Sequence, residues 1–403
     1  MSKALFVFDH KYPCDTNGQY YYSSGFDEEF FSRYYEIFDD LVIFGRKEII
    51  SSESAQKKNK IPFPCEIITF SSNKKIFTNG AIKRLKESIN SSDCVISRMP
   101  SIFGALAIKY AKKLKKSYIV EVVACTYDAL ISSSSWKRRI LAGPVECFYR
   151  HVIRGVPYCV YVTDEFLQTK YPCKGKQISC SNVTLLHVDD AVLESRNSKI
   201  KSSPLQHLII GTTSTLGVDF KGQQYVIKAL KTLKELGYDV EYQMVGDGNG
   251  DWLIEIAKLE GVSDRVKIIG SLPHHEVFNW LQTLDIYVHP SCQEGLSRAV
   301  IEAMSCACPI IAADTGGIHE LIDERYIVPK KSALSIAKAI DAMANKNTLM
   351  AQAAKNHEAS KKYLKSVLYA KRKSFYNEFL LDNGIKTKDM NAVVSECTNE
   401  KNN

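Results

Sequence analysis

The sequence lacks several patterns that would have assigned the protein to a class at once. It has no run of about 18 apolar residues, so we expect no membrane-spanning helix. Its first residues lead directly into an apolar stretch, without the regions of a secretory signal peptide. Aromatic residues are not interleaved with a dense basic patch, which argues against a nucleic-acid partner. Together these absences predict a cytoplasmic protein.

Cysteine is present, but not in the spacings that bind metal ions. Of the twelve cysteines, Cys306 and Cys308 form the closest pair, and no CxxC pattern occurs. Several cysteines lie within apolar runs and are expected to be small core residues in a reducing compartment. Asp189 and Asp190 follow His187, but no recognisable metal-binding loop follows them. We therefore expect no metal site.

Length and charge set broad limits. With 403 residues, about 150 per domain predicts two or three domains. The hydrophobic content of 45% and the charged content of 24% are ordinary for a globular protein. Residues 1–198 hold 28 Lys and Arg against 21 Asp and Glu, so they carry +7 of the net charge of +8. This excess favours an anionic partner, although a merely basic soluble protein is the alternative.

Apolar strands and helical patterns alternate along the chain. In the first half we expect strands at 4–8, 41–44, 66–70, 94–97, 118–123 and 158–162. In the second half we expect strands near 208–212, 240–245, 266–269, 285–289, 309–313 and 326–328. This alternation predicts two α/β halves, each with a doubly wound parallel sheet. Residues 9–25 are expected to be a polar loop, and 196–206, which contain Pro204, a linker.

Residues 132–155 differ from the rest of the first half. Basic, aromatic and aliphatic residues are mixed there, which suits a helix lying on an anionic membrane surface. An ordinary amphipathic helix of the domain explains the pattern equally well. We expect Pro144 to break or restart this helix.

The most informative stretch is 289–304. Its apolar strand ends at a turn, and Ser297 is a good N-cap for a helix whose buried stripe includes Val300 and Met304. Glu294 precedes this helix start and Glu302 follows it. Free amides at a helix start bind anions such as phosphate, and carboxylates accept hydrogen bonds from sugar hydroxyls. A surface ion pair of Arg298 with Glu302 is the simpler alternative.

Other glycine-containing loops follow strands of the second half. Residues 211–217 are small and are followed by Lys221, a point charge suited to a phosphate. Gly246 and Asp247 lie in a second loop at 245–250, and a third loop occupies 314–317. The glycines at 246–250 do not form the full G-x-G-x-x-G dinucleotide pattern.

In this order, these motifs resemble the retaining nucleotide-sugar glycosyltransferases of the GT-B fold, family 4, also called group 1 glycosyltransferases. The similarity is strong over about 207–325 and softer over 1–198. Motifs at 97–101 and 161–167 look like those of members that assemble bacterial surface polysaccharides. By this resemblance Glu302 would hold ribose hydroxyls, Glu294 would bind the donor sugar, and Lys221 would neutralise the leaving diphosphate. The catalytic candidates are Glu294 and Lys221, and the donor-binding candidates are Glu302, Gly295, Leu296, Ser297, Arg298, Thr212, Gly246 and Asp247.

Two features depart from the family pattern. Thr212 and Thr213 stand where relatives have an Arg, and Arg298 is a candidate to take over part of its role. No His occurs in 121–128, where many relatives place one near the reacting carbon. The acceptor-side candidates are therefore Gly18, Glu121 and Asp128.

The resemblance implies two Rossmann-like domains facing across a cleft. We expect an N-terminal acceptor domain at 1–198, a nucleotide-sugar domain at 207–362, a helix at 363–382 returning to the N-terminal domain, and a disordered tail at 383–403. The implied reaction moves a hexosyl or N-acetylhexosaminyl group, with retention, from a UDP- or GDP-sugar, UDP favoured, to a glycan or lipid-linked acceptor in surface-polysaccharide synthesis. No cofactor or metal is expected, and the protein would be cytoplasmic or peripheral on the inner membrane face. The alternatives are a non-catalytic GT-B scaffold and a nucleotide-sugar epimerase.

Overall fold

The computed structural model describes residues 2–23, 25–56, 58–61, 65–131 and 135–386, which form two compact units. The first unit takes in Met1–Ala124, Pro144–Cys180 and Tyr369–Asn403, and the second takes in Cys125–Gly143 and Ser181–Leu368. This division differs from the expected boundary after residue 198. Most of the expected tail at 383–403 lies outside the described residues. Among the residues described, no helix is long and apolar enough to cross a membrane.

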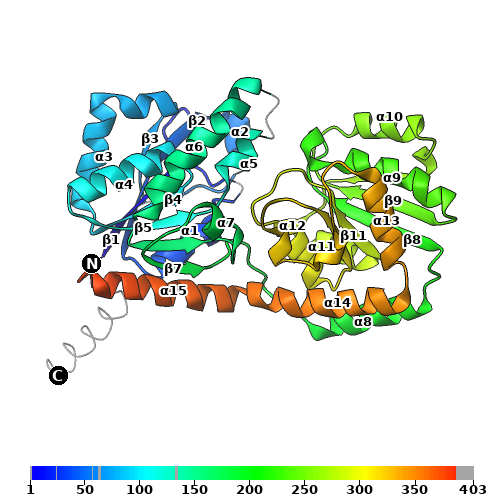
Figure 1. The fold of residues 1–403 in the computed structure, drawn as a ribbon. Coiled ribbons are helices and arrows are strands. Elements are labelled where there is room, and N and C mark those ends of the chain that lie inside the picture. Colours follow the sequence, from blue (N-terminus) through cyan, green and yellow to red (C-terminus); the bar gives the residue numbers. More distant parts are fainter. Residues whose placement is uncertain (1, 24, 57, 62–64, 132–134, 387–403) are drawn as a thin grey trace. The chain divides into compact units, whose positions relative to one another are not determined.

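The first unit is built on a parallel sheet of seven strands in the order β3-β2-β1-β4-β5-β6-β7 (Figure 1). Its strands are β1 (Lys3–Cys14), β2 (Asp40–Ile49), β3 (Glu66–Phe70), β4 (Cys94–Met99), β5 (Ser117–Val122), β6 (Tyr158–Tyr161) and β7 (Lys176–Ser179). Its helices are α1 (Glu28–Tyr35), α2 (Ser52–Gln56), η1 (Asn73–Phe77), α3 (Asn79–Ser91), α4 (Ile102–Lys113), the second half of α6 (Trp136–Arg154), α7 (Phe166–Lys170) and most of α15 (Lys365–Asp382). The central strand β4 is buried at every position, as strands covered on both faces must be.

The second unit has a parallel sheet of six strands in the order β10-β9-β8-β11-β12-β13. Its strands are β8 (His207–Thr213), β9 (Asp239–Val245), β10 (Val266–Gly270), β11 (Ile286–His289), β12 (Ile310–Ala313) and β13 (Ile327–Val328). Its helices are α5 (Thr126–Ile131), α8 (Asp190–Ser202), α9 (Gln223–Glu235), α10 (Asp251–Leu259), α11 (His274–Thr283), α12 (Arg298–Ser305), α13 (Ala333–Met343) and α14 (Lys346–Ser360), with short 3-10 turns η2 (Asp219–Lys221), η3 (Ser263–Arg265), η4 (Gly316–Glu320), η5 (Glu324–Tyr326) and η6 (Lys361–Tyr363).

Both sheets reverse their strand order at their first strand. In the first unit β1 lies between β2 and β4, and in the second unit β8 lies between β9 and β11. This order, with helices connecting parallel strands, is that of a doubly wound α/β sheet, which confirms the expected fold class. Ligands of such sheets bind beyond the carboxyl ends of the strands at the reversal. Each unit therefore has one edge where a binding site is expected.

Three local expectations were wrong, each because burial outweighs local sequence signals. Residues 9–14, expected in a loop, continue β1 and pair with the far end of β2, which buries Tyr12 and Cys14. Helix α6 runs through Pro144, held on both sides by the buried residues Ala142 and Tyr149. Much of the expected linker at 196–206 is the end of α8.

The end of α8 is fixed by a buried arginine. Arg196 is 3% exposed, and its Nη2 donates to the carbonyl oxygens of Leu281 at 3.0 Å and Cys306 at 3.1 Å. The guanidinium of Arg196 is hydrogen-bonded to carbonyl groups inside the fold, so this polar residue can be buried. For this reason the polar segment forms the end of a helix and not a linker.

A buried carboxylate connects α15 to the first sheet. Glu121 on β5 is 1% exposed, and it accepts hydrogen bonds from Tyr34 at 3.0 Å and from Tyr376 of α15 at 2.8 Å. Arg98 and Arg372 approach the same carboxylate at 3.5 Å and 3.8 Å. Burial acts to raise the pKa of Glu121, but the charges of the arginines around it lower that pKa below its ordinary value.

We expect Glu121→Ala to lower the free energy of unfolding by about 3–5 kcal/mol, because two buried guanidinium groups lose their counter-charge. Urea unfolding followed by circular dichroism measures this loss. Asp128→Ala, at the other acidic acceptor-side candidate, should change it by about 0.5 kcal/mol or less, as is usual for a surface substitution. Equal effects of the two substitutions would contradict a structural role specific to Glu121.

Candidate functional site

The loops at the reversal point of the second sheet bring most of the expected site residues together. Strands β8 and β11 are adjacent and parallel, so both end at the same edge. The loops after them carry Lys221 and Glu294, and the loop after β9 carries Gly246 and Asp247. The site is therefore assembled from three separate connections on one sheet edge.

Helix α12 begins where the sequence indicates. Ser297 is its N-cap, and the hydroxyl of Ser297 accepts a hydrogen bond from the amide of Val300. Val300, Ala303 and Met304 are fully buried, which fixes the helix against the sheet. The remaining amides of the first turn have no partner within the helix and make its start suitable for an anion.

Glu294 lies beside this helix start and contacts two basic groups. Its Oε1 is 2.7 Å from Nζ of Lys221 and 3.4 Å from Nε2 of His289. His289 is 2% exposed, and its Nε2 is also 3.2 Å from the hydroxyl of Ser297. Burial alone would raise the pKa of Glu294, but the hydrogen bond and charge of His289, with those of Lys221, lower it to about 2. Glu294 is therefore an ionised acceptor at neutral pH.

A glycine explains how Lys221 reaches Glu294. Gly222 has φ +81°, and a Cβ there would lie 2.1 Å from the carbonyl oxygen of Pro290. The same two loops are joined by a hydrogen bond from the amide of Cys292 to the carbonyl oxygen of Phe220 at 2.8 Å. Only glycine permits this close approach, which places Lys221 over the loop of Glu294.

Glu302 occupies a different environment from the one expected. It is 7% exposed, and its Oε1 is 2.9 Å from Nε2 of His274 on α11. Arg298 is exposed and, within the described part of the chain, makes no ion pair with Glu302 or any other carboxylate. The simpler interpretation, a surface pair of Arg298 with Glu302, is therefore wrong for this structure. One carboxylate oxygen of Glu302 has no hydrogen-bond partner among the described residues and is free to accept another hydrogen bond.

The glycine loops lie close to each other. A Cβ on Gly246 would lie 1.9 Å from the carbonyl oxygen of Ser214, so the loops after β8 and β9 touch. Asp247 has an exposed side chain, and its carbonyl accepts from the amide of Leu216 at 2.7 Å. Gly295 accepts from the amide of Gly317 at 2.8 Å, which joins its loop to the turn after β12. Leu296 lies partly exposed between Gly295 and Ser297.

Thr212 is placed inside the sheet. It is 2% exposed, its hydroxyl donates to the carbonyl of Val288 at 2.7 Å, and it accepts from the hydroxyl of Tyr242 at 2.9 Å. These bonds tie β8 to both of its neighbours. In this structure Thr212 therefore holds the strands together, and its hydroxyl has no proton left to donate to a ligand.

The three acceptor-side candidates are not gathered into one site. Gly18 is exposed in a turn after β1, with φ +85° and its amide donating to Asp15. Glu121 is committed to the buried network described above. Asp128 is partly exposed on α5, which groups with the second unit.

A basic site at the reversal point of the first sheet was not predicted from the sequence. Nε2 of His10 is 2.6 Å from the hydroxyl of Ser23, and its ring stacks on Phe26 with centroids 4.1 Å apart. Burial, and then the charges of Arg46 and Arg98, lower the pKa of His10 to about 4. A cavity of about 570 Å³ here is lined by Phe8, Asp9, His10, Lys11, Pro13, Ser23, Arg46, Glu48, Ile50 and Lys58. The available signal was the position of His10 directly after an apolar strand.

Two further residues were missed in the second unit. His289 and His274, the partners of Glu294 and Glu302, both stand at the edge of regular elements, His289 at the end of β11 and His274 at the start of α11. Such positions face the ligand edge of an α/β sheet, which could have marked them. Among the described residues, no three His, Cys, Asp or Glu side chains are grouped so that they could hold a metal ion.

The chain is similar to known sugar-transferring enzymes. The family model for glycosyl transferases group 1 matches residues 196–360. Protein CapJ of Staphylococcus aureus is 33% identical over 342 residues, which are 83% of this chain and 85% of that protein. The amylovoran biosynthesis glycosyltransferase AmsK of Erwinia amylovora is 30% identical over 175 residues, 41% of each protein.

Solved structures share the fold. Anabaena HepE in complex with UDP has a TM-score of 0.65 at 14% identity, over 94% of this chain and 100% of that one. The sucrose-phosphate synthase of Thermosynechococcus elongatus has a TM-score of 0.63 at 13% identity, over 95% of this chain and 100% of that one. At these identities the likeness concerns the fold alone, and it confirms the two-domain GT-B class.

The low pKa of Glu294 generates a test. Folding lowers this pKa from an ordinary 4.5 to about 2, so the charge stabilises the folded protein above about pH 4.5, and this contribution is lost as the pH falls toward 2. We expect the difference in unfolding free energy between wild type and Glu294→Gln to be constant near neutral pH and to shrink below about pH 4.5. Urea titrations at stepped pH measure it. The exposed carboxylate control, Glu235→Gln, should show no comparable trend, and a difference that grows on acidification would contradict the assignment.

Proposed function

The chain belongs to the group 1 glycosyltransferases, and on that premise we propose that it transfers a sugar, with retention, from a nucleoside-diphosphate donor held by the second unit. The observation that carries the proposal is the contact of Glu294 with Lys221 and His289 beside the free start of α12. An acceptor for hydroxyls, a cation and a helix start meet at one sheet edge. A sugar diphosphate requires these three groups.

Each part of the donor has a complementary group in this unit. The amides at the start of α12 suit the diphosphate, and the ionised Glu294 suits hydroxyls of the sugar. Glu302, held by His274, has an unused carboxylate oxygen for ribose hydroxyls. Lys221 can donate to Glu294 and still has two N–H groups for phosphate oxygens. We propose UDP as the preferred nucleotide, in line with the UDP complexes of structural relatives.

The proposed chemistry is driven by the departure of the diphosphate. The bond between the anomeric carbon and the phosphate oxygen breaks, and negative charge develops on the diphosphate beside Lys221 and the helix amides. The acceptor hydroxyl attacks the oxocarbenium-like sugar from the face that the diphosphate leaves, and its proton passes to a phosphate oxygen. The configuration at the anomeric carbon is then retained. No protein nucleophile and no metal ion is required by this scheme.

We place the acceptor at the first unit. The cavity beside His10 lies at the reversal point of its sheet and is lined by charged side chains of both signs, which suits the hydroxyl-rich glycan end of an acceptor. Because the pKa of His10 is about 4, its ring is neutral at physiological pH and can exchange hydrogen bonds with a hydroxyl. Relatives named for amylovoran and colanic acid biosynthesis support a role in surface-polysaccharide synthesis, with a glycan or lipid-linked acceptor.

Two alternatives remain open in this scheme. One is a scaffold that binds nucleotide sugar without turnover, because Thr212 supplies no cation and Glu121 is committed to the interior. A nucleotide-sugar epimerase would form product without an acceptor. Transfer that requires an acceptor separates our proposal from both.

We expect Glu294→Ala and Lys221→Ala each to reduce kcat by about 10²–10³-fold, because each removes a charged group at the developing transition state. Nucleotide release from UDP- and GDP-sugars is measured with a panel of lipid-linked acceptors, with and without a chelator, and the anomeric configuration is read by NMR. Glu235→Ala serves as the exposed control. Undiminished transfer by both site variants would exclude this site assignment, and an inverted product would exclude retention.

Donor binding is tested separately by Glu302. We expect Glu302→Ala to raise the Kd for UDP about tenfold, because hydrogen bonds from ribose hydroxyls to a charged group are lost. Isothermal titration measures the affinity, and thermal shifts extend it to a panel of nucleotide sugars. Glu276→Ala, an exposed acid on α11, is the matched control. Equal UDP affinity of wild type and Glu302→Ala would contradict the assignment of the ribose subsite.

A further inference from the structure

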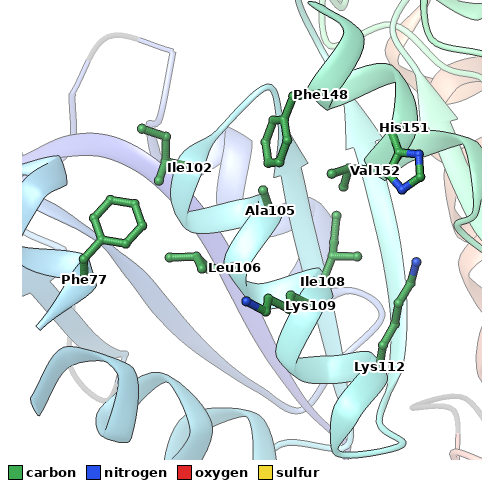
Figure 2. Close-up of a pocket in the computed structure, with 10 residues that line it drawn as sticks. All are labelled: Phe77, Ile102, Ala105, Leu106, Ile108, Lys109, Lys112, Phe148, His151 and Val152. Atoms are coloured by element: carbon green, nitrogen blue, oxygen red, sulfur yellow. The ribbon is translucent and has the colours of Figure 1, made fainter. Parts of the chain in front are cut away.

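A second cavity of the first unit is apolar and shares no lining residue with the basic cavity at His10. It has a volume of about 670 Å³ and lies among η1, α4 and the second half of α6 (Figure 2). Figure 2 shows Phe77 on one side of α4 and Phe148, His151 and Val152 on the other. Its walls are made by Phe77, Ile102, Ala105, Leu106, Ile108, Lys109, Lys112, Phe148, His151 and Val152.

The walls of this groove include apolar side chains that are accessible to solvent, whereas Ala105 and Ile108 in its floor are buried. Phe77 is 58% exposed and Phe148 is 52% exposed, and Ile102 and Leu106 are only partly buried. Two large aromatic side chains on either side of an aliphatic floor make a concave apolar surface that no other described part of the chain covers. Contiguous apolar surface of this kind marks an interaction site.

Cations stand at one side of the groove. Lys109 and Lys112 are exposed and occupy successive turns of the same face of α4. Among the described residues, neither forms an ion pair with a carboxylate. Figure 2 shows Lys112 extending toward His151. The groove therefore combines an apolar floor with uncompensated positive charge at its edge, which is the complement of a hydrocarbon chain that ends in phosphate.

We propose that this groove binds the hydrocarbon chain of a lipid phosphate, with Lys109 and Lys112 beside the phosphate. Identifying this ligand as the lipid part of a lipid-linked acceptor rests on the proposed function. The floor of the groove, at Ala105, lies between two walls. A single hydrocarbon chain can reach this floor, whereas the flat surface of a bilayer cannot, so the concave shape favours one inserted chain as the occupant. The exposed Trp136, Ile140 and Leu141 of α6 are not needed for this site.

Chain length provides a direct measure of burial. Each methylene transferred from water into an apolar site improves affinity up to about fourfold. Farnesyl phosphate should therefore bind more tightly than geranyl phosphate, and both more tightly than inorganic phosphate. These water-soluble probes are titrated into the full-length protein by isothermal calorimetry, with no sugar donor present.

Two variants test the groove by independent routes. Ala105→Phe fills its floor and should weaken farnesyl phosphate at least about tenfold, while leaving inorganic phosphate unchanged. Its matched control is Ala351→Phe, an exposed position on α14.

Lys112→Gln should weaken farnesyl phosphate about threefold, the size typical of an exposed charge pair, whereas Lys113→Gln, one residue outside the groove, should not. Thermal unfolding verifies that each variant is folded.

The outcomes separate this inference from the proposed function. Chain-length dependence that Ala105→Phe abolishes, together with weaker binding in Lys112→Gln, supports the lipid groove, even in a protein that transfers no sugar. Farnesyl phosphate that binds no better than inorganic phosphate overturns it, even in an active enzyme. Binding to phosphatidylglycerol vesicles that farnesyl phosphate does not compete for would overturn it in favour of a membrane-docking surface.

Discussion

The second unit depends on one constraint, which is that Glu294 must stay ionised although it is largely enclosed. A carboxylate in such a position is costly unless it is paired, and its partners come from the connection after β8 and from the end of β11. Lys221 is brought in by the left-handed Gly222 and the close approach to Pro290, and His289 by the end of β11. The glycine turn, the strand end and the helix cap are therefore parts of one electrostatic arrangement.

The same geometric rule operates in both units. Each sheet reverses its strand order at its first strand, and each reversal carries a histidine beside charged groups, His10 in one and His289 in the other. The two sites differ in charge. The first has three cations, Lys11, Arg46 and Lys58, beside the two acids Asp9 and Glu48, and the second pairs Lys221 with Glu294.

Much of this could be predicted from the sequence, and the misses have physical causes. All six strands of the second sheet and the cap at Ser297 were predicted, because apolar periodicity and capping are local signals. The extension of β1, the continuation of α6 through Pro144 and the helix over Arg196 were missed, because their stability comes from distant partners. Likewise, the partners of Glu302 and Glu121 were not predictable, since His274, Tyr34 and Tyr376 are remote in sequence.

The residue at position 212 limits the positive charge at this edge of the second sheet. Thr212 is a neutral residue whose hydroxyl is hydrogen-bonded to both strands beside β8. Arg298 is exposed in the first turn of α12. Lys221 is then the one Lys or Arg side chain that forms an ion pair with Glu294, among the residues described here. In the free protein its charge is balanced by Glu294. In the proposed reaction a diphosphate would share that charge, which lowers the affinity for the leaving group and favours its release after transfer. A single shared lysine is therefore consistent with turnover, since a site with uncompensated cations would hold the diphosphate product more tightly.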